Sequence, residues 1–391
     1  MTSDIEVNDA VKRLGTETAF EVLARAEALA AEGKSIINLG IGQPDFKTPE
    51  HVVEAAQKAL RDGAHGYTPA AGIPALRQSV ANDLQVRHQV AVDPSNVLIT
   101  PGAKPIMYFA ISILGEPGTE IMYPNPGFPI YESMIRYTGA TPVPIELKED
   151  AGFTFDADTV LSQVNENTRL IIINSPANPT GGVVPQDTFD KLVAGLEQYP
   201  KAVILSDEIY SRILYDGEKH VSLLQYESIR DRLIVIDGWS KTYAMTGWRL
   251  GYGIWPSTLF EYAEKLAVNS YSCPNAASQH AGIAALEGPQ DQVGQMLDAF
   301  DERRKAVVEG LNAISGITCV EPKGAFYAFP NVQETGFDTR DLQQRLLEET
   351  GVALVSGTSF GALGEGYLRV SYANSLENVN EAVSRIKEFL S

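Results

Sequence analysis

The stretch LIVIDGWSK (residues 233–241) joins an uninterrupted apolar run to a turn that carries a serine and a lysine. Short runs of aliphatic and β-branched residues without alternation are typical of strands buried on both faces of a sheet. Four other stretches repeat the pattern: VLITPGAK (97–104), EIMYPNPGF (120–128), LIIINSPANPTGG (170–182) and AVILSDEIY (202–210). Because helical patterns separate these strands, the sequence predicts a mainly parallel α/β sheet.

The turn after each predicted strand carries polar, charged or aromatic side chains. They are Lys104, Phe128, Asn178, Asp207, Ser240 and Lys241. Ligands of open α/β sheets bind outside the carboxyl ends of the strands. We therefore expect these side chains to form one site that several loops assemble.

The two ends of the chain follow a different pattern. Helical patterns over 291–314 and 339–350 alternate with short strands in GAFYAFP (324–330) and GYLRVSYA (366–373). A helix over 20–31 and a strand in KSIINLGIGQPDF (34–46) are expected to join them. We therefore expect an α/β fold in which residues 46–289 form a large domain with a mainly parallel sheet sandwiched by helices. Residues 290–391 form a smaller α+β domain, and residues 1–45 form an N-terminal arm and part of that small domain.

The composition excludes several classes of partner. The net charge of −19 disfavours binding to nucleic acid or to an anionic membrane surface. We find no apolar run long enough to span a bilayer and no secretory signal. Two cysteines cannot form a disulfide framework, and five histidines form no HExxH motif. These features predict a cytoplasmic protein without a bound metal.

Lys241 is the first candidate for chemistry. A lysine in a dry apolar pocket has a lowered pKa, and its neutral amine can form a Schiff base with a carbonyl group. Nearby, Ser240, Arg249 and the TPGAK turn before a helical stretch supply a hydroxyl, a guanidinium and backbone N–H groups. Together these groups suit a phosphate. Structural ion pairs remain the alternative for both Lys241 and Arg249.

The other turn residues suit a flat aromatic ligand. Asp207 ends a buried strand, so its carboxylate needs a partner such as a protonated ring nitrogen, unless it caps a helix. Tyr210 and Asn178 can bind a phenolic oxygen, and Phe128 can stack on a ring or simply pack in the core. A Schiff-base lysine, a phosphate site, a pyridinium partner and a stacking ring together describe pyridoxal phosphate.

The chain also resembles the fold type I pyridoxal-phosphate aminotransferases of class I/II, which include bacterial aspartate and alanine aminotransferases. The resemblance covers most of the chain and is carried by LGIGQPDF (39–46), YTPAAGIPALR (67–77), SPANPTGG (175–182), SDEIY (206–210), SKTYAMTGWRLGY (240–252) and GYLRVSYA (366–373). It implies a ping-pong transfer of an amino group between an L-amino acid and a 2-oxo acid.

The resemblance implies a role for each matching residue. Lys241 binds the cofactor aldehyde and carries the proton between the substrate Cα and the cofactor C4′. Asp207 pairs with the pyridine nitrogen, and Tyr210 and Asn178 hold the 3-hydroxyl group. The remaining roles are ring stacking by Phe128, phosphate binding by Gly102, Ala103, Ser240 and Arg249, and binding of the substrate α-carboxylate by Arg369 with Asn178 and Gly42. Tyr67 is expected to reach the phosphate of the neighbouring subunit, so the resemblance implies a homodimer with shared active sites.

Arg369 is also a candidate without the resemblance. Its neighbours are those of a strand, where a buried arginine needs a partner. A guanidinium matches a carboxylate with two parallel hydrogen bonds, although a salt bridge at the strand edge remains the alternative. Gly42 and Arg369 both fall in the expected small domain, so we expect that domain to close over the substrate.

The substrate side chain is less well defined. Lys104 lies where some aspartate-active relatives place a lysine for the distal carboxylate, which favours aspartate or glutamate with 2-oxoglutarate. Lys104 can instead support the cofactor phosphate or lie on the surface. Glu17 can line the same pocket and would disfavour an acidic side chain, so alanine and aromatic donors stay open.

Three other functions fit part of the pattern. A β-lyase that cleaves C–S bonds would use the same lysine and the same cofactor. A pyridoxal-phosphate-binding regulatory protein would need a DNA-binding module, which the short N-terminal segment and the acidic charge disfavour. A nicotinamide-binding Rossmann enzyme would need a third glycine, which LGIGQPD lacks.

Overall fold

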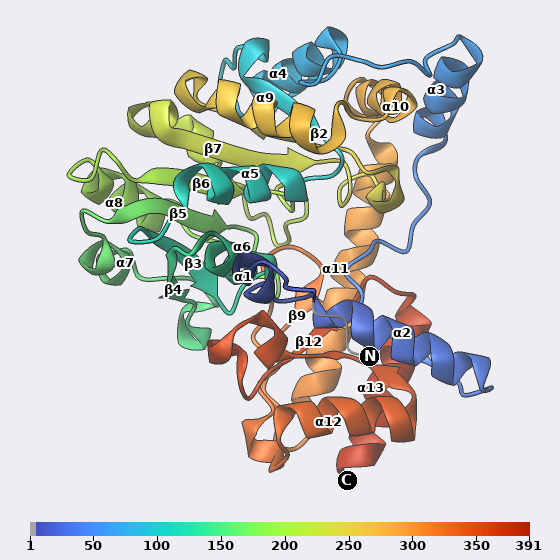
Figure 1. Cartoon of the computed structure of the whole chain (residues 1–391). Coiled ribbons are helices and arrows are strands. Elements are labelled where there is room, and N and C mark those ends of the chain that lie inside the picture. Colours follow the sequence, from blue (N-terminus) through green and yellow to red (C-terminus); the bar gives the residue numbers. More distant parts are fainter. Residues whose placement is uncertain (1–4) are drawn as a thin grey trace.

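The computed structural model describes residues 5–391. Its centre is a seven-stranded sheet in the order β2-β8-β7-β6-β5-β3-β4 (Figure 1). The strands are β2 (Val97–Thr100), β3 (Glu120–Asn125), β4 (Thr141–Glu146), β5 (Thr168–Asn174), β6 (Val203–Asp207), β7 (Leu233–Gly238) and β8 (Gly251–Ile254). Only β8 runs antiparallel to its neighbours β2 and β7. The five predicted strands are therefore confirmed as β2, β3, β5, β6 and β7.

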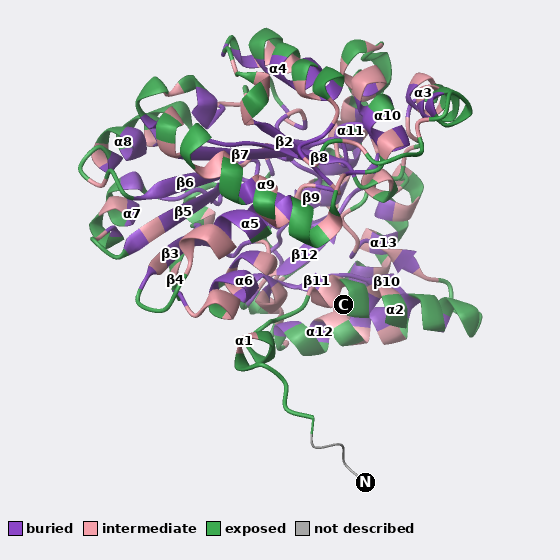
Figure 2. Cartoon of the chain, turned by 45° about the horizontal axis from the view of Figure 1, so that its top comes forward, coloured by how far each residue is buried: buried purple, intermediate pink, exposed green. Residues whose placement is uncertain are grey.

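Helices cover both faces of this sheet. Successive residues of β5 point to opposite faces: Ile171 and Ile173 pack in one apolar cluster, and Leu170 and Ile172 pack in another. The first cluster includes residues of α3 (Glu50–Arg61), α4 (Pro74–His88), α7 (Ala157–Gln163), α8 (Gln186–Leu196) and α10 (Ala276–Glu287). The second includes residues of α5 (Lys104–Leu114), α6 (Ile130–Thr138) and α9 (Ser257–Tyr271). Burial on both faces explains the continuous apolar runs, and Figure 2 shows the strands buried beneath partly exposed helices.

Both ends of the chain meet in a second body. Strand β1 (Ile37–Asn38) pairs in parallel with β10 (Val352–Ala353), so the N-terminal segment joins the C-terminal part as expected. A three-stranded antiparallel sheet has the order β11 (Val355–Ser356), β12 (Leu368–Ser371) and β9 (Tyr327–Ala328). The helices around these strands are α2 (Thr18–Ala31), α11 (Asp291–Asn312), α12 (Thr339–Arg345) and α13 (Leu376–Leu390) (Figure 1). We therefore keep 46–289 and 290–391 as the proposed large and small domains, and 1–45 as the proposed arm. Residues 1–4 of that arm lie outside the described residues.

Short helices complete the chain. Helix α1 (Asp9–Lys12) precedes α2, and a π-helical turn (Leu346–Thr350) continues α12 through the predicted range 339–350. The 3₁₀ turns are Pro94–Asn96, Glu149–Ala151, Leu223–Gln225, Glu227–Arg232, Thr246–Trp248, Gln333–Thr335, Gly357–Phe360 and Ala362–Gly364. Over the described residues, every helix is too short or too polar to cross a membrane.

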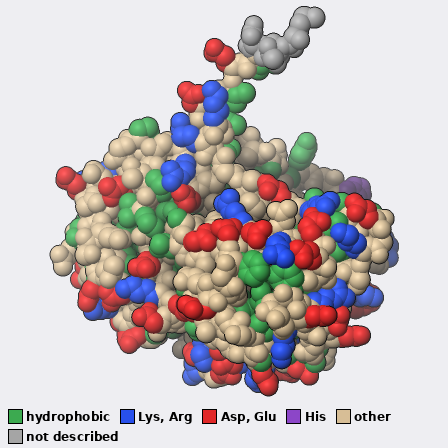
Figure 3. Space-filling model, turned by 90° about the horizontal axis from the view of Figure 1, so that it is seen from below, with side chains coloured by type: hydrophobic (Ala, Val, Ile, Leu, Met, Phe, Trp, Pro, Cys, Tyr) green, Lys and Arg blue, Asp and Glu red, His purple; other side chains and the backbone are tan. Residues whose placement is uncertain are grey.

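The surface of the small-domain side mixes both signs of charge. Figure 3, seen from below the view of Figure 1, shows acidic and basic side chains interspersed over this face. Such a pattern is typical of a solvated surface.

Candidate active site

A cavity of about 550 Å³ lies at the carboxyl ends of the parallel strands. Asn174 and Asp207 end β5 and β6, and Lys241 follows β7, so three neighbouring strands deliver side chains to it. The opposite wall comes from the arm and from the small-domain sheet through Gly42, Tyr327 and Arg369. The predicted residues on the lining are Glu17, Gly42, Ala103, Lys104, Phe128, Asn178, Asp207, Tyr210, Ser240, Lys241, Arg249 and Arg369.

Lys241 points into the cavity. Its Nζ donates a hydrogen bond of 2.6 Å to the carbonyl oxygen of Gly42 and lies 5.9 Å from the ring centroids of Tyr210 and Phe326. Burial, together with the positive charges of Arg369 and Arg249, lowers the pKa of Lys241 to about 8. About a tenth of the amine is therefore neutral at pH 7, far more than for a lysine in water, and the neutral amine is the nucleophilic form.

Asp207 is held on the floor of the cavity. The hydroxyl of Tyr131 donates to its Oδ2 at 2.7 Å, and the backbone N–H of Ile209 donates to its Oδ1 at 3.3 Å. Burial, together with the negative charges of Asp237 and Glu208, raises the pKa of Asp207 to about 6. A cation in the cavity would therefore be bound strongly by this carboxylate.

Arg369 is a buried cation with an unused donor. Its Nη1 donates to Asn178 Oδ1 at 3.0 Å and its Nη2 to the carbonyl oxygen of Gly40, while its Nε is buried without a partner among the described residues. The guanidinium lies 4.7 Å from the ring centroids of Tyr327 and Phe360, and burial lowers its pKa. An anion that enters the cavity would supply the missing acceptor.

The loop that carries Asn178 is fixed by Asn174. The Oδ1 of Asn174 accepts from the backbone N–H of Asn178 at 2.8 Å, and its Nδ2 donates to the carbonyl oxygen of Asp207 at 3.0 Å. This amide therefore sets the distance between the strand that ends in Asp207 and the loop that meets Arg369.

Tyr210 and Tyr327 connect the large sheet to the small one. Their hydroxyl groups are 2.7 Å apart, and burial raises the pKa of Tyr210 well above its usual range. Gly42 packs directly against this pair, because a Cβ at Gly42 would lie 2.2 Å from the hydroxyl oxygen of Tyr327. Only glycine fits here without a shift of the tyrosine.

Arg249 and the turn before α5 form one corner of the cavity. Gly102 has φ +81° and lies against the guanidinium, because a Cβ at Gly102 would be 2.3 Å from Arg249 Nη2. Arg249 itself has a left-handed backbone with φ 54°, a conformation that costs about 1–3 kcal/mol and is concentrated at functional sites. Ala103 precedes the first turn of α5, whose free backbone N–H groups favour an anion.

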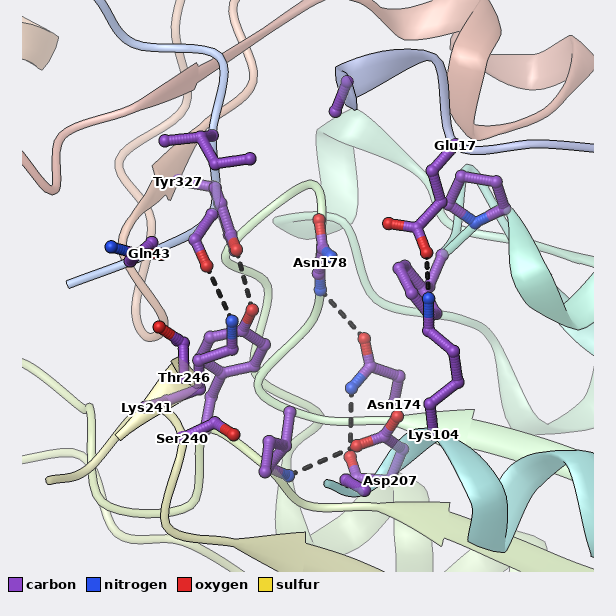
Figure 4. A pocket seen from close by; sticks show the side chains of 18 of the residues that line it. Glu17, Gln43, Lys104, Asn174, Asn178, Asp207, Ser240, Lys241, Thr246 and Tyr327 are labelled. Carbon is purple, nitrogen blue, oxygen red and sulfur yellow. Dashed lines mark hydrogen bonds and ion pairs between the residues drawn. The ribbon is translucent and has the colours of Figure 1, made fainter. Parts of the chain in front are cut away.

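Phe128 and Lys104 line the other side of the cavity. The Lys104 ammonium lies 5.4 Å from the centroid of the Phe128 ring and forms an ion pair with Glu17. In Figure 4, Lys104 and Glu17 lie across the cavity from Lys241 and Ser240, with Asn178 between the two groups. The Lys104 ammonium is therefore directed toward Glu17.

Two predicted residues do not line the cavity. Gly102 contacts the guanidinium of Arg249, which does line the cavity. Tyr67 is 93% exposed and lies on the surface of this single chain. Its expected role in a second subunit therefore stays a prediction.

Sequence reasoning missed three residues of the site: Tyr131, Asn174 and Tyr327. Asn174 is the last residue of a predicted strand and could have been found by the rule that named Asp207. Tyr131 lies one residue inside α6, where it was hidden in a helical pattern. Tyr327 lies in the quoted segment GAFYAFP, and only packing reveals which of its aromatic side chains faces the cavity.

Known proteins share this fold. The model of the family "Aminotransferase class I and II" matches residues 34–386. The aspartate aminotransferase of Bacillus sp. is 36% identical over 97% of this chain and 98% of its own length. That of Pyrococcus horikoshii is 40% identical over 92% of each chain. The structure of the Thermus thermophilus aspartate aminotransferase with maleate has a TM-score of 0.93 and 32% identity, and covers 98% of this chain and 99% of that one.

Proposed function

The chain belongs to the class I and II aminotransferases, and we propose that its cavity holds pyridoxal phosphate and each substrate in turn. It is a pyridoxal-phosphate-dependent enzyme that moves an amino group between an L-amino acid and a 2-oxo acid by a ping-pong mechanism. The observation that carries the site assignment is one cavity in which Lys241, with a pKa lowered to about 8, faces Asp207, Tyr210 and Arg369.

The residues of the cavity fit the cofactor. Asp207 offers a buried carboxylate to the pyridine nitrogen, and the hydroxyl of Tyr210 and the amide of Asn178 suit the 3-hydroxyl group. Arg249, Ser240 and the start of α5 suit the phosphate, as the tight contact between Gly102 and Arg249 indicates. Phe128 supplies a ring face beside them.

When bound, pyridoxal phosphate supplies an aldehyde that accepts the amino group and a ring that withdraws electrons from the substrate Cα. Lys241 Nζ would act as the general base and acid that moves the proton away from the substrate Cα, a role worth roughly 10²–10⁴-fold. Asp207 would hold a protonated ring nitrogen at its carboxylate and so stabilise the negative charge that develops. Tyr131 and the N–H of Ile209 orient the Asp207 carboxylate for this role.

The α-carboxylate of the substrate binds Arg369. The Nε of Arg369 is buried without a partner among the described residues, and a carboxylate can accept from Nε and one Nη of a guanidinium in parallel. Asn178 orients the guanidinium through its 3.0 Å hydrogen bond, and the aromatic rings of Tyr327 and Phe360 enclose it. A substrate held in this way would bring its Cα toward Lys241 in the same cavity.

We propose a dicarboxylic amino acid, aspartate or glutamate, as one substrate, with 2-oxoglutarate as an acceptor. The relatives named aspartate aminotransferases support this, as does the Thermus thermophilus structure with maleate, which is a dicarboxylate. On this chain Lys104 is the lining cation that the cofactor and the α-carboxylate leave unassigned.

We also propose a cytoplasmic homodimer with shared active sites. The support for the dimer is Tyr67, whose exposed ring reaches away from its own subunit, and further exposed apolar side chains at Tyr108, Tyr262 and Val268. The support for the cytoplasm is that both cysteines are free thiols.

The test is the absorption spectrum of the purified enzyme with glutamate and no acceptor. We expect the visible-edge band of the bound cofactor to shift to the shorter-wavelength band of the amine form, and Lys241→Ala to lack this shift. A band that persists with every amino acid, together with pyruvate released from a β-substituted donor, would instead identify a β-lyase.

A further inference from the structure

Glu17 and Lys104 form an ion pair on the wall of the cavity. We propose that Glu17 is an exchangeable counter-ion for Lys104. It neutralises the ammonium when the substrate side chain is uncharged, and it yields its place to the distal carboxylate when the substrate is dicarboxylic. This inference rests on the proposed function and defines its substrate class as uncharged amino donors together with dicarboxylic partners.

The charges on the lining single out this pair. The lining contains four cations, Lys104, Lys241, Arg249 and Arg369, and two carboxylates, Asp207 and Glu17. The proposed function assigns three of the cations and Asp207 to the cofactor and to the α-carboxylate. Lys104 and Glu17 remain, and their opposite charges neutralise each other. The substrate side chain therefore meets a wall whose net charge is zero until the pair opens.

Glu17 lies close enough to Lys241 and Arg369 to influence their pKa values. Its negative charge raises the pKa of Lys241 and of Arg369, against the larger lowering effect of burial on both groups. Figure 4 places Glu17 and Lys104 together on the side of the cavity opposite Lys241. This is the side left to the substrate side chain once the amino group faces Lys241 and the α-carboxylate faces Arg369.

The pair is built to exchange rather than to stabilise the fold. The Lys104 side chain is 45% exposed and that of Glu17 is 16% exposed, and ion pairs at such partly exposed positions contribute little to stability. A substrate carboxylate can therefore replace Glu17 at small cost. An ammonium left unpaired beneath an apolar substrate side chain is strongly disfavoured, and Glu17 prevents that state.

The start of α2 offers hydrogen-bond donors that the Glu17 carboxylate does not use. Glu17 is the N-cap residue of α2, but its side chain forms no capping hydrogen bond. The first-turn N–H groups of a 14-residue helix favour a carboxylate, and the adjacent Thr18 Oγ1 is buried without a partner among the described residues. Rotation of one side chain would move the carboxylate from Lys104 to these donors.

The segment around Glu17 is anchored so that only the side chain needs to move. Upstream, Arg13 donates to the carbonyl oxygens of Arg136 and Tyr137, and the N–H of Gly15 donates to Ser133 Oγ. These contacts fix the arm on α6. The exchange therefore involves the carboxylate and not the backbone.

The rest of the side-chain wall suits uncharged donors. Phe20, Ile41, Met107, Phe128 and Phe360 contribute apolar surface to the lining. In a ping-pong reaction both partners use the same pocket in turn. An exchangeable Glu17 lets this pocket accept an apolar or aromatic donor in one half-reaction and a dicarboxylate in the other.

The test compares glutamate with phenylalanine as the donor in single-turnover half-reactions of the holoenzyme. We expect Glu17→Gln to raise the ratio of kcat/KM for glutamate to kcat/KM for phenylalanine by about tenfold. The distal carboxylate of glutamate no longer competes with Glu17 for Lys104. The phenylalanine ring, in contrast, must bury a Lys104 ammonium that has no counter-ion. Lys104→Met should lower the ratio by about tenfold or more. Adding Lys104→Met to Glu17→Gln should restore phenylalanine turnover, which a merely structural role of Glu17 would not produce.

The matched control is Glu21→Gln, an exposed acid one helical turn further along α2 and outside the lining, whose ratio should equal that of the wild type. An unchanged ratio in Glu17→Gln, with transamination retained, would overturn the inference and leave the proposed function intact. If that variant does not fold, Glu17→Ala is measured in its place, with the same expected rise of the ratio and the same contradicting outcome. A wild-type enzyme that transaminates no amino acid would overturn both.

Discussion

At the scale of single residues, the cavity works by shifting two pKa values in opposite senses. Burial lowers the pKa of Lys241 to about 8 and raises that of Asp207 to about 6. Removal from water disfavours the charged form of each group, so the amine becomes a better base and the carboxylate gains more from a cationic partner. The same cause thus prepares both groups for their proposed roles.

Asp207 should make the cofactor-free protein less stable as the pH rises. The folded-state pKa of about 6 exceeds the usual 3.8, so the folded protein holds this proton more tightly than the unfolded chain does. The stabilisation that the proton provides is present below about pH 4 and is lost as the pH rises through about 6. We expect cofactor-free Asp207→Asn to match the wild type near pH 4 and to exceed its unfolding free energy by about 2–3 kcal/mol at pH 7.

Urea unfolding of both cofactor-free proteins across this pH range measures the difference, and equal stabilities at pH 7 would contradict the assigned cause.

In the holoenzyme the same substitution should reduce kcat by about 10²–10³-fold, because the partner of the ring nitrogen is lost. Gain of stability with loss of activity is the signature of a residue retained for function.

Gly42 should tolerate no side chain. A Cβ there would lie 2.2 Å from the Tyr327 hydroxyl, which pairs with Tyr210 at 2.7 Å, so Gly42→Ala must displace that pair and the carbonyl that binds Lys241. We expect kcat/KM for glutamate to fall by about 10²-fold with the fold retained. Gly66→Ala is the control, since a Cβ at Gly66 meets no atom within 4 Å. Equal activity of the two variants would show that the contact can relax.

At the scale of elements, the phosphate corner depends on how closely β8 approaches the turn between β2 and α5. A Cβ at Gly251, the first residue of β8, would lie 2.5 Å from the backbone nitrogen of Ala103. The left-handed Arg249 just before it aims the guanidinium at Gly102. The antiparallel β8, inserted between β2 and β7, is therefore what brings Arg249 to the start of α5.

Gly251→Ala should weaken cofactor binding more than it weakens the fold. Because the new methyl group pushes the Gly102–Ala103 turn away from Arg249, we expect the Kd for pyridoxal phosphate to rise by about tenfold or more. Titration of the cofactor-free enzyme by absorbance measures the Kd. Gly294→Ala, an exposed position of α11 outside the lining with no atom within 4 Å of its Cβ, serves as the control. A Kd unchanged in both variants would remove this corner from the phosphate site.

At the scale of the whole molecule, the cavity lies between two bodies. Lys241, Asp207 and Arg249 belong to the large sheet, whereas Gly42, Tyr327 and Arg369 come from the arm and the small sheet. The arm reaches the small body through the β1–β10 pairing and the ion pair of Asp45 with Arg303 at 2.7 Å. Substrate contacts with both bodies therefore favour their approach.

We expect the small domain to close when a dicarboxylate binds the holoenzyme. Small-angle scattering with maleate should show a reduced radius of gyration, because the ligand joins Arg369 of the small sheet to Lys104 and Asn178 of the large domain. Arg369→Ala should show no such change, since the α-carboxylate loses its partner. An identical radius with and without maleate in the wild type would contradict closure of the small domain.

Local sequence determined much of this molecule. Strands such as Thr168–Asn174 could be predicted from the sequence, because a strand buried on both faces needs an unbroken apolar run. The polar residues that follow these strands predicted the floor of the site. The strand expected in 34–46 is shorter, Ile37–Asn38, because the carbonyl groups of Gly40 and Gly42 bind Arg369 and Lys241 instead of a neighbouring strand. Strands β4 and β8 lacked the continuous pattern, since β4 is largely exposed and β8 is rich in glycine.

Only the tertiary structure decided which groups meet across the cavity. Lys241 and Gly42 are 199 positions apart, Arg369 and Asn178 are 191 apart, and Lys104 and Glu17 are 87 apart. No local pattern encodes these pairs, because each depends on how the small body packs against the large sheet. The sequence by itself determined the family and the chemistry of the floor, since strand burial and turn residues are local properties. The ion pair between Glu17 and Lys104 on the cavity wall depends on how the arm packs against α5 and α6. Only the folded chain determines that packing.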